Sequence, residues 1–61
     1  MPLVTVGLYE GRSIEKKREL VQAVTETVAR VLNTPPESVW VILEDVPKQN
    51  WGAGGVLASD R

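Results

Sequence analysis

The 61-residue chain contains no cysteine and no histidine. The absence of cysteine excludes disulfide bonds, and the absence of both residue types removes the usual ligands of a structural zinc ion or a haem. A chain of this length buries only about 60% of its unfolded surface when it folds alone. Because 43% of the residues are hydrophobic, we expect oligomerisation to supply the rest of the stability.

The chain also lacks an excess of charge and a long apolar run. Its net charge of −1 gives no excess of basic residues of the kind that binds nucleic acid. No apolar stretch approaches the roughly 18 residues of a membrane-spanning helix, and no basic leader precedes an apolar segment. We therefore expect a cytoplasmic protein that binds neither nucleic acid nor membrane.

Two segments have the composition of β-strands. Residues 3–9, LVTVGLY, and residues 39–46, VWVILEDV, are rich in β-branched and aromatic side chains, which predicts strands. The tail, residues 48–61, contains three glycines and suits a turn or hairpin. It is not a phosphate-binding loop, because no Gly-Lys-Ser/Thr follows the glycines and no helix begins behind them.

A helix is predicted between the two strands. Ser13 is a good N-cap, and Asn33 followed by Pro35-Pro36 ends the segment. Apolar residues recur between these limits at the spacing of one helical face. They are Leu20, Val21, Val24, Val28, Val31 and Leu32.

The order strand, helix, strand forms a β-α-β unit with parallel strands and a right-handed crossover. Both strands are apolar at both alternating positions, which is typical of strands buried on both faces. One helix covers only one face of such a sheet. We therefore predict a two-layer α/β fold in a single domain over residues 1–61, with a C-terminal hairpin, completed by a second copy of the chain.

Pro2 is the first candidate functional residue. Methionine aminopeptidases remove Met1 when the next residue is small, and removal would make Pro2 an amino-terminal secondary amine. An α-amine has a pKa of about 8, and burial in an apolar pocket or a neighbouring cation lowers it. A base tuned near neutral pH suits proton transfer. The alternative is that Pro2 only starts a strand, where its missing N–H costs nothing.

Arg12 is the second candidate. It follows the carboxyl end of a predicted strand, where α/β proteins tend to bind ligands, and an arginine there can hold a carboxylate bidentately. The alternative is an ordinary surface arginine. Pro2 and Arg12 lie about 25 Å apart along the extended chain, so a site that contains both draws them from different subunits.

Trp40 and Trp51 are two of only three aromatic residues. In a parallel pair Trp40 lies at the Pro2 end of the sheet. Both side chains suit an apolar wall that desolvates the Pro2 amine, and both also suit a core or an interface between subunits.

The sequence resembles the 4-oxalocrotonate tautomerase family, the smallest members of the tautomerase superfamily, over essentially its whole length. The resemblance rests on the Met1-Pro2 start and on three further blocks: LYEGRS at 8–13, SVWVI at 38–42 and WGAGGVLA at 51–58. In the block at 38–42, the family pattern specifies no residue at position 40.

The resemblance implies a homohexamer, built as a trimer of dimers, with its sites at subunit interfaces. It implies that Pro2 moves a proton between carbons of an enol or dienol acid and that Arg12 of a neighbouring subunit holds a substrate carboxylate. It further implies that Trp51 lines the wall that lowers the proline pKa, and that the C-terminal hairpin closes dimer onto dimer. Aromatic catabolism is the pathway class that goes with such an enzyme.

The chain departs from the family at Trp40, where the best-studied members carry an arginine that binds the 2-keto or enolate end of the substrate. Loss of such a donor costs about 3 kcal/mol of transition-state stabilisation. The departure at Trp40 therefore argues against assuming that the dicarboxylate 2-hydroxymuconate is the substrate. A monocarboxylate such as an arylpyruvate enol is the alternative, as is a second arginine from another partner.

The expected function is a keto–enol tautomerase that needs no cofactor or metal and acts on a 2-hydroxydienoate or arylpyruvate-type enol acid. Pro2 is the base and acid, and Arg12, Trp40 and Trp51 bind the substrate. One alternative is a related hydratase or dehalogenase, although the tail offers only Asp60 as a water-activating carboxylate. The other is a catalytically weak subunit of a mixed hexamer.

Overall fold

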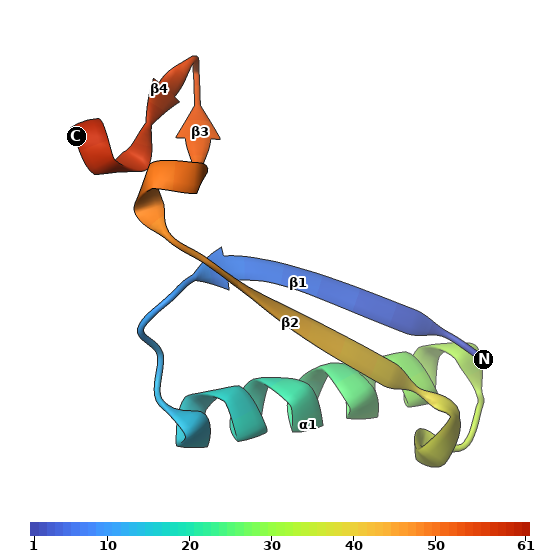
Figure 1. Ribbon diagram of the computed structural model, residues 1–61. Helices are drawn as coiled ribbons and strands as arrows, with labels where there is room; N and C mark the ends of the chain where they lie inside the picture. The colour runs from blue at the N-terminus through green and yellow to red at the C-terminus, as the bar shows by residue number, and fades with distance from the viewer.

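The computed structural model describes all 61 residues. In Figure 1, one helix covers one face of a two-stranded sheet, and a small hairpin stands apart beyond the end of the sheet. Short 3₁₀ turns at Pro36–Ser38, Lys48–Asn50 and Ala58–Asp60 join or end these elements. The elements in chain order are β1 (Leu3–Tyr9), α1 (Ile14–Leu32), β2 (Trp40–Val46), β3 (Gly52–Ala53) and β4 (Val56–Leu57).

The ends of α1 lie where the sequence predicted them. Ser13 is the N-cap, and its Oγ accepts a hydrogen bond from the backbone N–H of Lys16 at 3.2 Å. Asn33 is the C-cap in the left-handed conformation, with φ of 54°, which satisfies a terminal carbonyl through its own N–H.

β1 and β2 pair in parallel, as predicted, from Leu3 opposite Trp40 to Tyr9 opposite Val46. β2 begins one residue later than predicted. The N–H of Val39 instead donates to the carbonyl of Pro36 at 3.0 Å and closes the preceding 3₁₀ turn. The two strands therefore start and end level with one another.

Only one face of this sheet is covered. Three residues of the whole chain are buried: Leu8, Ala29 and Val39. On the face away from α1, Leu3, Trp40 and Ile42 are 56%, 58% and 48% exposed. We call these three residues the open apolar face, and it is the face that the sequence predicted a second copy would cover.

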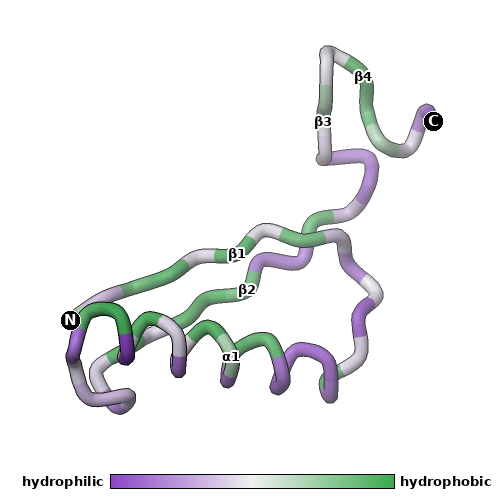
Figure 2. The backbone as a smooth tube through the Cα atoms, turned by 180° about the vertical axis from the view of Figure 1, so that it is seen from behind, coloured by the Kyte–Doolittle hydropathy of each residue, from purple (hydrophilic) through white to green (hydrophobic).

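The hydropathy colours show where apolar residues gather. In Figure 2 they run along β1, β2 and the side of α1 that faces the sheet. Val31 and Leu32 belong to the predicted apolar stripe of α1, yet they are 66% and 59% exposed. They lie in the last turn of the helix, where no other part of the chain covers them.

The predicted tail hairpin is formed by β3 and β4, which pair antiparallel. Gly54 and Gly55 at its turn both have positive φ, 61° and 82°, as the favoured two-residue hairpin turn requires. The hairpin is tied at its base, where the N–H of Ala58 donates to the carbonyl of Trp51 at 2.7 Å. None of the helices combines the length and the apolar character that crossing a membrane requires.

Candidate active site

Pro2 is held at the amino end of the sheet. Its carbonyl accepts a hydrogen bond from the backbone N–H of Trp40 at 3.0 Å, directly before the first paired residues of the two strands. Pro2 itself is half-buried. The parallel pairing thus places Pro2 and Trp40 at the same end of the sheet, as the sequence predicted.

The Trp40 side chain belongs to the open apolar face. Its cross-strand partner on that face is Leu3, and neighbouring positions on one face of a sheet bring their side chains into contact. Ile42 continues the same face two residues further along β2. Next to Pro2 along β1 and across on β2, the first paired residues, Leu3 and Trp40, are therefore both apolar.

Arg12 lies at the opposite end, in the loop between β1 and α1. The first residue after β1 is held against the end of β2, because the N–H of Glu10 donates to the carbonyl of Val46 at 3.1 Å. The chain then turns at Gly11, whose φ of 107° is one that a side chain would disfavour. Arg12 makes no hydrogen bond or ion pair within the chain, so its guanidinium is free to bind an anion.

A shallow depression of about 290 Å³ adjoins Arg12. Its other lining residues all come from α1: Lys16, Glu19, Leu20 and Ala23. Lys16 is paired with Glu19 at 3.4 Å, which leaves Arg12 as the unpaired cation of this depression.

Trp51 lies at the Arg12 end of the sheet, because its ring packs on that of Tyr9, the last residue of β1. The two ring centroids are 4.6 Å apart at an interplanar angle of 57°. The ammonium nitrogen of Lys48 lies 5.5 Å from the centroid of the Tyr9 ring, within the range of a cation–π interaction. We call Tyr9, Lys48 and Trp51 the aromatic cluster.

Tyr9 was not singled out as a site residue from the sequence. Its packing against Trp51 brings together residues far apart in the chain, and no local pattern reports such a contact. The one available signal was its position three residues before Arg12, at the carboxyl end of a strand.

One chain does not unite the four predicted residues. Pro2 and Trp40 lie at one end of β1, and Arg12 and Trp51 lie at the other. The seven residues of β1 separate these ends by roughly 23 Å, which is beyond the reach of any side chain. A site that contains all four residues has to be built from more than one copy of the chain.

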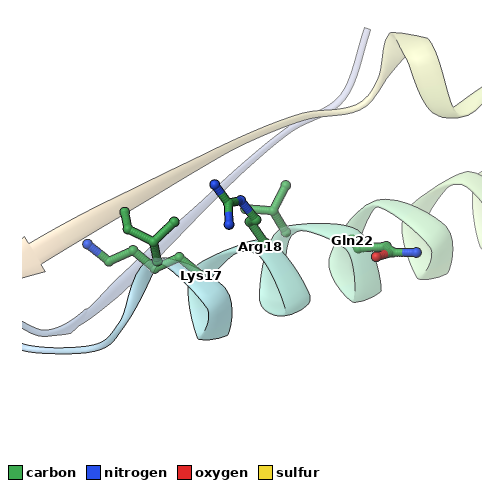
Figure 3. A pocket seen from close by; sticks show the side chains of 5 residues that line it. Lys17, Arg18 and Gln22 are labelled. Atoms are coloured by element: carbon green, nitrogen blue, oxygen red, sulfur yellow. The ribbon is translucent and has the colours of Figure 1, made fainter.

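The largest depression on the chain lies elsewhere. It measures about 410 Å³ and runs along α1, lined by Ile14, Lys17, Arg18, Val21 and Gln22. Figure 3 shows the Lys17 and Arg18 side chains rising from α1 towards the strands, and Lys17 is paired there with Asp45 of β2. None of the predicted site residues lines this depression. Nor does any group of three acidic side chains come together in a way that would hold a metal ion.

Comparison with known sequences gives the class of the protein. The family model described as "Tautomerase enzyme" matches residues 2–61. A protein of Listeria monocytogenes named "Probable tautomerase" is 48% identical over 60 residues, which are 98% of each chain. The 2-hydroxymuconate tautomerase of Comamonas testosteroni is 38% identical over 60 residues, which are 98% of this chain and 95% of that protein.

Solved structures agree with the sequence comparison. A crystal structure of a 4-oxalocrotonate tautomerase homologue is 52% identical, with a TM-score of 0.89 over 100% of this chain and 97% of that one. A heterohexameric 4-oxalocrotonate tautomerase from Chloroflexus aurantiacus is 33% identical, with a TM-score of 0.93 over 98% of this chain and 97% of that one.

The chain therefore belongs to the tautomerase family and has the fold of the 4-oxalocrotonate tautomerase homologues. It is an isomerase with tautomerase activity.

Proposed function

We propose that the protein is a keto–enol tautomerase of 2-hydroxydienoate or arylpyruvate-type enol acids and that Pro2, exposed by removal of Met1, is its base and acid. The observation that carries the proposal is the parallel register of β1 and β2. It places Pro2 at the same end of the sheet as the apolar residues Leu3 and Trp40, with an unpaired arginine beyond the other end of the same strand.

The reaction moves one proton from an oxygen to a carbon of the substrate, so the substrate neither gains nor loses atoms. The uncharged Pro2 nitrogen accepts the proton of the substrate's 2-hydroxyl group as the C2–O bond becomes a carbonyl and the carbon–carbon double bond shifts. The resulting secondary ammonium then gives this proton to the carbon that has gained electron density. Pro2 ends the cycle uncharged, and no cofactor takes part in either step.

The surroundings of Pro2 favour its uncharged form. The open apolar face beside it has poor affinity for an ammonium ion, and burial of this face against another copy removes water from the amine. Both effects lower the pKa of the Pro2 amine towards neutral pH. A guanidinium from a neighbouring Arg12 acts in the same direction.

Arg12 binds the substrate carboxylate in this proposal, and Trp40 and Trp51 form the apolar walls. The substrate named for the Comamonas relative is the dicarboxylate 2-hydroxymuconate. If it bound here, Arg12 would hold one carboxylate, and the oxygens near Trp40 would face an indole instead of a cation. An enol acid with one carboxylate and an aryl group matches a site with one free arginine and two indoles. In this proposal the enzyme acts in aromatic catabolism.

We also propose that the working form is a homohexamer built from three dimers. The open apolar face supports additional copies, as does the distance between Pro2 and Arg12 if both residues serve one site. A mixed hexamer is the second candidate, favoured by the heterohexameric relative from Chloroflexus aurantiacus and by Trp40. In that case another short chain would supply a cation at the Trp40 end.

Subunit mixing tests the shared site. Pro2→Ala and Arg12→Ala proteins, each purified alone, should have little activity on a 2-hydroxydienoate. After unfolding and reassembly together, some sites would combine an intact Pro2 with an intact Arg12, and activity should return. Absence of recovery, despite subunit exchange demonstrated with a tagged chain, would contradict a site built from both residues.

An intact-mass measurement of the purified protein accompanies this test. A species lighter by one methionine is expected, since only that species has a basic nitrogen at Pro2. A fully active preparation that retains Met1 would exclude Pro2 as the base. Co-purification of a second short chain would instead favour the mixed hexamer.

A further inference from the structure

Tyr9 has a free hydroxyl group at the end of the sheet that carries Arg12. Its ring contacts that of Trp51, at 4.6 Å between centroids, and the Lys48 ammonium, at 5.5 Å from the Tyr9 centroid. The hydroxyl makes no hydrogen bond to any other residue of the chain. Tyr9 is half-buried in one chain, and a tyrosine that becomes buried usually finds a hydrogen-bond partner for its hydroxyl.

The backbone fixes the position of Tyr9 at the end of the sheet. Tyr9 ends β1 opposite Val46, and the next residue, Glu10, is hydrogen-bonded to the same Val46. The 3₁₀ turn of Lys48–Asn50, which directly precedes Trp51, follows β2 close to the end of β1 (Figure 1). Tyr9 thus contacts the indole proposed to line the substrate site, and it lies three residues before Arg12 on the same chain.

The Trp40 side chain brings no charged donor to the site, and Arg12 is committed to the carboxylate in the proposed function, so the substrate oxygen on which charge develops calls for a further hydrogen-bond donor. We infer that the Tyr9 hydroxyl donates a hydrogen bond to the substrate oxygen on which enolate charge develops, in the site that Arg12 of the same chain serves. This inference rests on the proposed function, because it requires Trp51 and Arg12 to lie in the substrate site. It makes Tyr9 a catalytic residue from the same subunit as Arg12.

Tyr9→Phe tests the role of the hydroxyl, since it keeps the ring against Trp51 and Lys48. We expect kcat on a 2-hydroxydienoate to fall by about 10²-fold, the order of effect for one oxyanion donor, with KM changed much less. The melting temperature and the sedimentation of the assembly should stay those of the wild type. Thr25→Val, which removes a hydroxyl from α1, is the control and should keep full activity.

Mixing experiments separate this inference from a structural role. Tyr9→Phe reassembled with Pro2→Ala should regain activity, because some sites then combine an intact Pro2 with an intact Tyr9. Tyr9→Phe reassembled with Arg12→Ala should regain none. Tyr9 and Arg12 of one chain serve the same site, so every site in the mixture lacks either the Tyr9 hydroxyl or the Arg12 guanidinium.

Two outcomes would overturn the inference. One is undiminished kcat in Tyr9→Phe, and the other is recovery of activity in the Tyr9→Phe with Arg12→Ala mixture. Either result leaves the proposed function intact as long as Pro2→Ala and Arg12→Ala remain impaired. Full activity of Pro2→Ala would instead remove the proposed function itself.

Discussion

The backbone N–H of Trp40 donates a hydrogen bond to the carbonyl oxygen of Pro2 at 3.0 Å. This contact joins the start of β1 to the start of β2 and places Trp40 at the same end of the sheet as the residue proposed as the base. Trp40 is 58% exposed in a single chain, so its side chain is available both to a substrate and to another subunit.

Trp40→Arg tests whether this side chain faces the reacting end of the substrate. We expect kcat/KM for 2-hydroxymuconate to rise about ten-fold, or about 1.4 kcal/mol of differential stabilisation, because an added cation holds the enolate oxygen. Activity on an arylpyruvate enol should fall, since apolar wall is exchanged for charge. Steady-state kinetics on both substrates give the comparison.

Trp40→Phe is the matched control, because it shortens the wall without adding charge and should bring no gain on the dicarboxylate. A Trp40→Arg protein that melts earlier and gains nothing on 2-hydroxymuconate would show that Trp40 serves packing. The cause in that case would be a buried, unpaired charge.

The pH dependence of kcat/KM should report the Pro2 amine. The base works only when deprotonated, so kcat/KM should rise with pH through the lowered pKa and level off near neutrality. Trp51→Ala should move this limb to higher pH, because water then reaches the amine and its protonated form is stabilised. A limb unmoved by Trp51→Ala would place that indole away from the base.

Ile42→Lys should break the assembly. Ile42 is 48% exposed on the open apolar face, and a lysine buried there against another copy would carry an uncompensated charge. Sedimentation at micromolar concentration should show smaller species and loss of activity. Glu26→Lys, on the exposed side of α1, is the control and should sediment as the wild type does. Retention of the full assembly by Ile42→Lys would mean that this face is not an interface.

The ion pair between Lys17 and Asp45 should stabilise the packing of α1 on β2. Its side chains are 25% and 39% exposed, against 72% and 73% for the Lys16–Glu19 pair, and exposed pairs contribute little. Lys17→Met should lower the free energy of unfolding by about 1 kcal/mol, and Lys16→Met by a few tenths at most. Urea titrations at one fixed protein concentration measure both changes. Equal effects of the two substitutions would contradict the difference in burial as the cause.

The secondary structure could be predicted closely because each boundary has a local cause. Ser13 caps the helix through its own hydroxyl, Asn33 ends it in the left-handed conformation, and two glycines form the hairpin turn. The start of β2 was misplaced by one residue because Val39 is held by the preceding 3₁₀ turn, a competition that composition does not reveal.

The candidate site could be predicted only in part. Pro2 and Arg12 stand out from their position and chemistry, and the β-α-β order alone puts Trp40 at the Pro2 end. Tyr9 and Lys48 could not be found in this way. Their contact with Trp51 depends on how the chain leaves β2 and returns past the end of β1.

The sequence by itself determined the element order and the parallel pairing, because capping, periodicity and strand composition act locally. It also predicted a partner chain, because the total apolar content exceeds what one helix and two strands can bury. Only the tertiary structure decided which side chains meet. It left Leu3, Trp40 and Ile42 on one uncovered face and stacked Trp51 on Tyr9, because such contacts depend on register and on the path of the connecting turns. The separation of Pro2 from Arg12 follows from both: strand length sets the distance, and the fold brings no other segment to close it.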